Sequence, residues 1–485
     1  MAWKRDRRLH SFLGAIGVLA VLGLAAAPVG GQSTEGASGV TFTKDIAPIL
    51  QRSCQKCHRP DGVAPMSLIS YEDVRPWARA IKMRTGIGPR AGVMPPWYLE
   101  KNIGIQHFKN DPSLSDDEIT KIAKWTDSGA PRGNAADMPP PRTWDNANKW
   151  AIGTPDLIVK TSEVAVKAVA PDWWGEIEGV PTGLTEDRYV TAVEVKEIND
   201  LPPTGSGSAT VGGRYVFHHY VFSTSVLDGS EVNGQSADRA AGDGATTWPV
   251  HEVGREADFF DLDSARLLKA NSYIFSDSAH LHANGRDTKA HLLIAFKFAP
   301  KGFVPKFKRS PVALGTTDLD IRALEANQQA HSYVVLPEHT KILSFEPHLH
   351  APGMRMCMEA IWGAQIQTLN CAGYDHSWVR GYNYDDDHAP ILPKGTILHI
   401  IGYMDNSPTN KNVPDPRNWQ GSGNRSVANM LLDLGNKVSL TEEQFQEEMA
   451  RRRERLKLTR NTYTIGCPLC TVSTATPTRK TQQQP

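Results

Sequence analysis

The short stretch from Cys54 to His58, near the start of the chain, limits most strongly what this sequence can fold into. Its residues, Cys-Gln-Lys-Cys-His, follow the C-x-x-C-H pattern, in which two cysteines attach a haem covalently and the histidine is an iron ligand. The chain has 485 residues, so hundreds follow this motif. At about 150 residues per domain, roughly three domains are expected. A haem unit would therefore be only the first part of a larger protein.

Residues 40–133 are expected to form one helical unit around this motif. Residues 42–53 carry apolar side chains at helical spacing, and a closing helix is predicted to begin at Ser115 and end near Gly129. This order of a helix, a C-x-x-C-H loop and a closing helix resembles the cytochrome c domains. The resemblance implies a small all-α domain. It would bind one covalent haem c through Cys54, Cys57 and His58.

A second iron ligand is expected from a methionine downstream of the motif. Met94 lies in a loop stiffened by prolines, whereas Met66 and Met83 are the alternatives. Met66 follows the attachment loop too closely to reach the other face of the haem. A haem held by histidine and methionine has a raised potential, which suits electron transfer better than oxygen chemistry. The other interpretation of the motif is a zinc or redox C-x-x-C followed by an unrelated histidine.

The first residues of the chain have the pattern of an export signal. Several basic residues precede the apolar run from Phe12 to Leu24, and small residues follow it. This pattern predicts a secretory signal peptide over residues 1–31, because the run is short for a membrane anchor. We expect a secreted or periplasmic protein with no membrane span after cleavage. Basic and acidic residues balance at 53 each, so no net charge recruits nucleic acid.

Beyond a linker rich in proline and asparagine, residues 134–160, the sequence predicts β structure. Short runs of alternating apolar and polar residues are separated by Gly, Pro, Asn and Asp, as in β-sandwiches. The 40 glycines and 33 prolines also favour turn-rich β structure over helical bundles. One later helix is predicted over residues 441–458, acidic at its start and basic at its end, as the helix dipole prefers.

Ten of the 16 histidines fall between residues 218 and 350, and most of them come in pairs. The pairs are His218 with His219, His280 with His282, and His348 with His350. On a strand, residues two apart point to the same face, so an H-x-H pair can bind one metal ion. Adjacent histidines point to opposite faces, so a metal shared by His218 and His219 requires a bulge or a strand end. Imidazole suits zinc and copper alike, whereas a nearby thioether favours Cu(I). The candidate thioethers are Met354, Met404 and Met430.

The order of these groups, H-H, then a single histidine, then H-x-H, then a distant methionine, resembles the copper type II, ascorbate-dependent monooxygenases. That family includes peptidylglycine α-hydroxylating monooxygenase and dopamine β-monooxygenase. The resemblance covers roughly residues 160–435, and several segments look like bacterial members fused behind a cytochrome c domain. It implies two all-β jelly-roll sandwich domains, over residues 161–305 and 306–436. A charged helix and polar tail would follow over residues 437–485.

The resemblance also implies two copper ions and their ligands. An electron-transfer copper would be held by His218, His219 and His280, with His282 as the alternative to His280. An oxygen-activating copper would be held by His348, His350 and Met430, with Met404 as the alternative to Met430. The implied reaction consumes O2 and hydroxylates an unactivated C–H bond of an organic substrate. Electrons would come from a soluble reductant such as ascorbate, from a redox protein or through the haem.

Several residues depart from the family pattern. Glu346 stands where the peptidylglycine enzyme has an arginine that binds the substrate carboxylate, and a glutamate repels carboxylates. A peptidylglycine substrate is therefore not expected. The other departures are Ser278, Asn429, Leu432 and Leu434. Because these changes bear on activity more than on metal binding, the alternative function is a non-catalytic copper-binding or electron-transfer protein on the same scaffold.

Four further cysteines form two candidate pairs. Cys357 and Cys371 lie in the second predicted copper domain and are placed to bridge a hairpin. Cys467 and Cys470 form a C-x-x-C without a following histidine, within a polar tail. A local disulfide or an ordered part of the tail is expected there, since a third metal site would need ligands from elsewhere.

Overall fold

The computed structural model describes most of the chain after its first residues. The described residues are 39–60, 62, 64–143, 149–200, 215–226, 245–252, 255, 257–418, 429–460 and 462–471. The signal peptide predicted over residues 1–31 lies outside them, as does part of the predicted linker. Among the described helices, none has the length and apolar character needed to cross a bilayer.

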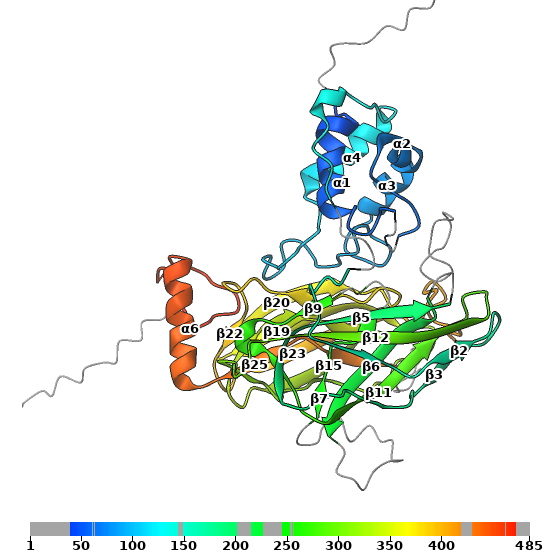
Figure 1. Ribbon diagram of the computed structural model, residues 1–485. Helices are drawn as coiled ribbons and strands as arrows, with labels where there is room; N and C mark the ends of the chain where they lie inside the picture. The colour runs from blue at the N-terminus through cyan, green and yellow to red at the C-terminus, as the bar shows by residue number, and fades with distance from the viewer. Residues whose placement is uncertain are drawn as a thin grey trace, which may run out of the picture. The chain divides into compact units, whose positions relative to one another are not determined.

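The N-terminal region contains most of the helices (Figure 1). They are η1 (Phe42–Ile46), α1 (Ala47–Ser53), α2 (Tyr71–Val74), η2 (Arg75–Trp77), α3 (Ala78–Thr85), α4 (Asp116–Asp127) and η3 (Ala135–Asp137). Their buried side chains, among them Leu50 and Trp125, form one apolar cluster. The predicted closing helix is confirmed as α4. Its cap Ser115 accepts a hydrogen bond from the Glu118 backbone N–H, and Gly129 follows with a φ of +88°.

The segment between α3 and α4 contributes to a different core. Trp97 and Leu99 are buried in a cluster with β-strand side chains that lie between Leu314 and Leu431 in the sequence. Leu99 also forms a β-bridge with Ala372. At Gly104 the φ is +67°, and an added Cβ would lie 1.9 Å from the Leu369 carbonyl oxygen, so the contact requires glycine. Part of the range 40–133, which was expected to form one helical unit, therefore packs into the core of the β-strands that follow.

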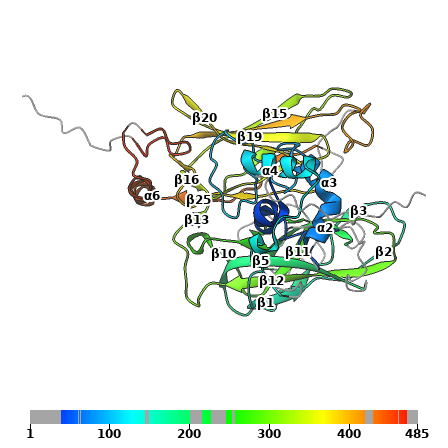
Figure 2. The same ribbon diagram turned by 90° about the horizontal axis from the view of Figure 1, so that it is seen from above.

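The first β region contains two sheets (Figure 2). One has the order β1 (Leu157–Lys160), β12 (Thr288–Phe298), β5 (Arg188–Asn199), β10 (Arg266–Leu268), with β2 (Val164–Val166) beside β12 and β9 (Ala257–Phe259) beside β5. The other has the order β3 (Trp173–Gly175), β11 (Ser272–Leu281), β6 (Phe217–Val226), β7 (Thr246–Thr247), with β4 (Val180–Pro181) beside β11 and β8 (His251–Glu252) beside β6. A 3-10 turn, η5 (Leu262–Ser264), precedes β10. One buried cluster includes Phe296 of the first sheet and Phe222 of the second, so the two sheets share a core.

The second β region contains four smaller sheets. Their orders are β13 (Lys308–Arg309), β25 (Lys437–Leu440), β16 (His339–Ile342), β22 (Ile391–Leu392); β14 (Leu314–Thr316), β24 (Leu431–Asp433), β18 (Pro347–Leu349); β15 (Gln328–Val335), β23 (Ile397–Met404), β19 (Gly353–Trp362), β20 (Gln365–Gly373); and β17 (Ser344–Phe345), β21 (Tyr382–Asn383). The described chain is thus mostly β-sheet with few helices, as predicted, and the sheets are compatible with β-sandwich domains.

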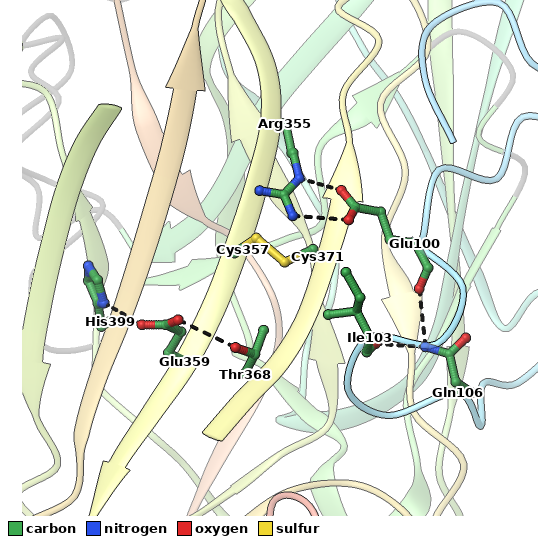
Figure 3. Close-up of a disulfide and its surroundings, with 9 residues drawn as sticks. All are labelled: Glu100, Ile103, Gln106, Arg355, Cys357, Glu359, Thr368, Cys371 and His399. Atoms are coloured by element: carbon green, nitrogen blue, oxygen red, sulfur yellow. Dashed lines mark hydrogen bonds and ion pairs between the residues drawn. A yellow bond between two sulfur atoms is a disulfide. The ribbon is translucent and has the colours of Figure 1, made fainter. Parts of the chain in front are cut away.

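Residues after the predicted second copper domain pack against it. β25 pairs with β13 and β16, and the charged helix predicted over 441–458 is confirmed as α6 (Glu442–Arg455). Cys467 and Cys470 form a disulfide that is buried in a cluster with Phe445 of α6. The hairpin disulfide is confirmed as well. Cys357 and Cys371 lie directly opposite each other on β19 and β20, with 4.1 Å between their Cα atoms (Figure 3).

Candidate metal centre

A bulge in β6 brings His218 and His219 to a common site. His280 of β11 lies opposite His219, and the next pair is Leu281 with Phe217, so His218 is the extra residue. Such an insertion lets two consecutive side chains turn toward one point, although a regular strand sends them to opposite faces. The bulge predicted as the condition for a shared metal is confirmed.

His218, His219 and His280 form a group that is able to hold one metal ion. Their candidate ligand nitrogens all lie within 4.8 Å of one another. The ring centroid of His280 is 4.8 Å from that of His218 and 5.1 Å from that of His219. Nitrogens that bind one ion each lie about 2.0–2.1 Å from it, so small movements of these rings would allow them to share an ion.

Two residues that the sequence did not single out hold the His280 ring in place. Asp172 Oδ2 lies 3.1 Å from Nε2 of His280, and the Trp174 ring stacks on the imidazole at 4.3 Å. The other ring nitrogen, Nδ1, is buried without a hydrogen-bond partner in the described part of the chain. A carboxylate behind a histidine, with the opposite nitrogen unoccupied, is the arrangement that metal-ligating histidines show.

His282 lies beside this group without joining it. Its ring is 5.7 Å from that of His218 and 6.3 Å from that of His280. The three-histidine group that meets the distance condition among the described residues contains His280 and not His282. Of the two histidines left open by the sequence, the geometry therefore favours His280.

His348 and His350 form the second pair. His348 lies in β18, His350 follows that strand, and their ring centroids are 5.3 Å apart. Residues two apart on a strand share a face, so both imidazoles point the same way. Nδ1 of His348 is buried without a hydrogen-bond partner among the described residues. The pair is therefore placed to ligate one ion from a single sheet face.

Two of the three candidate methionines, Met430 and Met404, lie on opposite sides of β18. His348 is paired with Leu432 of β24 and Leu349 with Leu431, so continuing this register brings Met430 opposite His350. Residues opposite each other in an antiparallel pair share a face, which places Met430 on the face of the histidines.

Met404, by contrast, belongs to the apolar core. A Cβ added at Gly402 would meet the Met404 methyl at 3.3 Å and a Leu349 methyl at 3.4 Å, so these two side chains pack together. Leu349 points away from the face of His348 and His350. Met354, the third candidate, is 39% exposed. The strand register therefore favours Met430 over Met404 and Met354 as the thioether of the second pair.

Burial keeps these imidazoles uncharged. It lowers the pKa of His218 to about 3, and the neighbouring imidazoles of His280 and His282 act in the same direction. Burial likewise lowers the pKa of His348 to about 3, with His350 adding to the effect. At neutral pH both side chains are neutral, which is the form that binds metals.

His376, which no sequence pattern singled out, lies between the two groups. Its ring centroid is 6.5 Å from that of His218 and 6.3 Å from that of His350. It belongs to the loop after β20, where the buried Tyr374 donates its hydroxyl hydrogen to the Leu349 carbonyl oxygen. A lone histidine in a loop gives no local signal, so only the folded chain could reveal this position.

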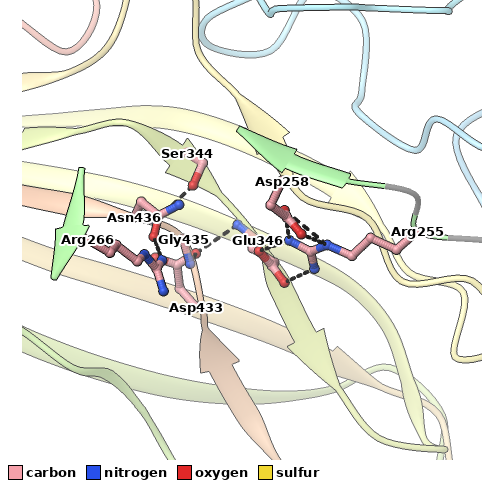
Figure 4. Close-up of polar contacts among 8 residues, drawn as sticks. All are labelled: Arg255, Asp258, Arg266, Ser344, Glu346, Asp433, Gly435 and Asn436. Carbon is pink, nitrogen blue, oxygen red and sulfur yellow. Dashed lines mark hydrogen bonds and ion pairs between the residues drawn. The ribbon is translucent and has the colours of Figure 1, made fainter. Parts of the chain in front are cut away.

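Glu346 forms an ion pair within the protein. Its Oε1 lies 2.8 Å from Nη1 of Arg255, and the same guanidinium donates to Asp258 Oδ2 at 2.9 Å (Figure 4). These two carboxylates raise the pKa of Arg255 well above its usual value although burial opposes them. Glu252, opposite His219 in the β6–β8 pair, is also buried, and burial raises its pKa to about 8. Each nitrogen of the Arg255 guanidinium therefore donates to Asp258 or Glu346.

The C-x-x-C-H residues, over which haem attachment is predicted, form a compact turn. The backbone N–H groups of Cys57 and His58 both donate to the Cys54 carbonyl oxygen, which closes one tight turn. Nδ1 of His58 lies 3.3 Å from the Met66 carbonyl oxygen. Because that oxygen can only accept, Nδ1 carries the hydrogen and Nε2 keeps its lone pair for a metal. Burial lowers the pKa of His58, which favours the neutral ring.

The candidate iron-binding methionines differ in their surroundings. Met66 packs against the helical cluster and contributes its carbonyl oxygen to His58. Met83 is 58% exposed on α3. Met94 is 39% exposed, and its backbone N–H donates to the Arg84 carbonyl oxygen. Met94 as the iron ligand stays a prediction.

Neither a protein-family model nor a curated protein matches this chain. What the site can bind is therefore inferred from its own residues. Three neutral histidines meet at a bulge, and a second histidine pair with a methionine across the neighbouring strand lies near them, with His376 between.

Proposed function

We propose that the chain is a secreted, haem c-fused dicopper monooxygenase that uses O2 to hydroxylate a C–H bond of an organic substrate. The observation that carries this proposal is the meeting of His218, His219 and His280 at the β6 bulge, close to a second histidine pair. Imidazole ligands with a soft thioether suit copper, which supplies one-electron chemistry with O2 when bound. The two β regions would be the two jelly-roll domains of the copper type II monooxygenases.

The two groups of residues would divide the work. His218, His219 and His280 would hold the copper that accepts electrons, and Asp172 would fix the orientation of His280 through Nε2. His348, His350 and Met430 would hold the copper where O2 is used. The neutral imidazoles leave their nitrogens available at physiological pH.

The N-terminal region would supply electrons as a cytochrome c domain. Cys54 and Cys57 would form the two thioether bonds, and Nε2 of His58 and the sulfur of Met94 would bind the iron. The contact of His58 with the Met66 carbonyl supports this assignment because it fixes the tautomer. Ascorbate, another small reductant or a redox protein would reduce the haem or the copper directly.

The surroundings of the second pair indicate a substrate without a carboxylate at that position. Arg255 is held between Glu346 and Asp258, so it is not available to bind an anionic group. Leu432, opposite His348, adds apolar surface next to the histidines.

The test is O2 consumption coupled to a hydroxylated product by the copper-loaded protein. A panel of uncharged and cationic substrates would be compared with carboxylates, and product would be quantified by mass spectrometry. We expect product formation that is lost in His348→Ala. Copper that binds and cycles between oxidation states while no substrate is hydroxylated would instead indicate a non-catalytic electron-transfer protein.

A further inference from the structure

The loop after β20 connects the segment around Met94 to the two histidine groups. Asp375 Oδ2 accepts a hydrogen bond from the backbone N–H of Gly92 at 3.1 Å and another from the hydroxyl of Tyr98 at 3.4 Å. Gly92 and Tyr98 lie on either side of Met94 in the sequence. One carboxylate therefore holds both ends of the segment that contains the candidate iron ligand.

The segment around Met94 and the end of β20 lie in close backbone contact. The backbone N–H of Gly373 donates to the Tyr98 carbonyl oxygen at 2.9 Å. A Cβ added at Gly373 would lie 1.9 Å from the Pro89 carbonyl oxygen, so any larger residue would push the segment away. The contact is thus built into the backbone and does not depend on Asp375 alone.

His376 continues this contact toward the metal-binding residues. It is bonded directly to Asp375, and its ring lies between those of His218 and His350 at 6.5 and 6.3 Å. Nδ1 of His376 is buried and has no hydrogen-bond partner in the described part of the chain. Ser377 donates its backbone N–H to Asp375 Oδ1, which fixes the carboxylate and the loop together.

We propose that Asp375 and His376 form the junction through which an electron passes from the Met94 segment to the histidine groups. This inference rests on the proposed function, since it requires haem at Cys54, Cys57 and His58 and copper at the histidines. In the step, haem Fe(II) becomes Fe(III) and one Cu(II) becomes Cu(I), with no bond made or broken and no proton moved. Hydrogen bonds and covalent bonds join the Met94 segment to His376, and the gap that remains lies between the His376 ring and the rings of His218 and His350. Asp375 is a positioning residue that holds the segment in place.

The experiment measures electron transfer within the fully loaded protein. The haem is reduced by a rapid photochemical pulse without O2, and its absorbance then reports reoxidation by copper. We expect Asp375→Ala to slow reoxidation, because the Met94 segment loses the acceptor of its hydrogen bonds from Gly92 and Tyr98. Asp375→Asn, which keeps an oxygen acceptor for Gly92 and Tyr98, should remain near the wild-type rate.

His376→Ala provides a second variant and should slow the reaction similarly. Haem and copper contents are quantified for each variant, and rates are compared for fully loaded chains.

Arg355→Met is the matched control. Arg355 forms an ion pair with Glu100, which ties the same segment to β19 without involving His376 (Figure 3). This control should leave the rate unchanged. A wild-type rate in both Asp375→Ala and His376→Ala, or equal slowing by Arg355→Met, would overturn the junction. If the wild-type protein loads copper and haem but never transfers an electron between them, the junction fails. If it loads no copper, the proposed function fails with it.

Discussion

The two histidine groups are built in different ways. His218 and His219 converge because β6 bulges, and His280 is backed by Asp172 and stacked on Trp174. His348 and His350 share a face through ordinary strand geometry, and their thioether candidate comes from the opposite strand. The first group is fixed by its surroundings, whereas the second depends on two strands staying in register. This difference agrees with the roles proposed for them, an electron-transfer site that changes little and a reaction site that must admit O2 and substrate.

Removing a ligand from either group should separate the roles of the two groups most clearly. His348→Ala should abolish product formation and lower the copper content by one ion per chain, while the first group keeps its copper. His218→Ala should remove the other copper and stop turnover by blocking electron supply. The measurements are copper per chain and product per O2 consumed. Full activity in His348→Ala would exclude the second pair as the reaction site.

The carboxylate behind His280 should matter for the first group alone. Asp172→Asn should weaken copper binding there about 10- to 100-fold, because a carboxylate behind a ligating histidine raises its basicity and fixes its ring. The second group should keep its affinity, as measured by competitive titration with a chelator.

The matched control for that prediction is Glu359→Gln. Glu359 lies 2.9 Å from Nδ1 of His399, a histidine outside both groups, so it has the same carboxylate–imidazole contact without a predicted metal (Figure 3). Copper affinity should not change in this variant. Equal losses in both variants would mean that Asp172 has no special role.

The metal-free protein should lose stability as the pH falls below 6.5. Burial lowers the pKa of His218 and of His348 to about 3 in the folded state, whereas unfolded histidines titrate near their ordinary value. The unfolded state therefore binds more protons between these values, and the free energy of unfolding decreases as pH falls. Each such histidine contributes a slope of about 1.4 kcal/mol per pH unit. Urea unfolding between pH 6 and 5 measures the slope, which should decrease in His218→Ala.

The two methionines should give the smallest and most selective effects. Met430→Leu should weaken Cu(I) binding at the second group more than Cu(II) binding, because only the thioether is lost. Met404→Leu should leave copper binding unchanged and cost less than about 1.5 kcal/mol of stability, as volume-conserving core changes do. Titration with Cu(I) and thermal unfolding distinguish these outcomes. The reverse pattern would make Met404 the ligand.

Local patterns were enough to predict much of the fold and part of the site. The cap at Ser115, the helix α6, the Cys357–Cys371 bridge and the need for a bulge at His218 all follow from residues close together in sequence or in neighbouring strands. Such features are determined by spacing, which a sequence shows directly.

Other features depended on contacts between distant parts of the chain. Asp172 meets His280 across 108 positions, and Arg255 meets Glu346 across 91. The loop at Asp375 meets Gly92 across 283. No spacing rule relates residues so far apart, and each of them is an ordinary residue in its own segment. The sequence marks Glu346 as a departure from the family pattern, but it does not show that Arg255 pairs with it.

We propose that one chain holds a haem and two copper sites. Metal quantification on protein produced with haem maturation and then loaded with copper tests it most directly, together with spectra of the copper centres. We expect about one iron and two copper ions per chain, with one copper lost in His218→Ala and the other in His348→Ala. A protein that binds no copper, or keeps both ions in both variants, would contradict it.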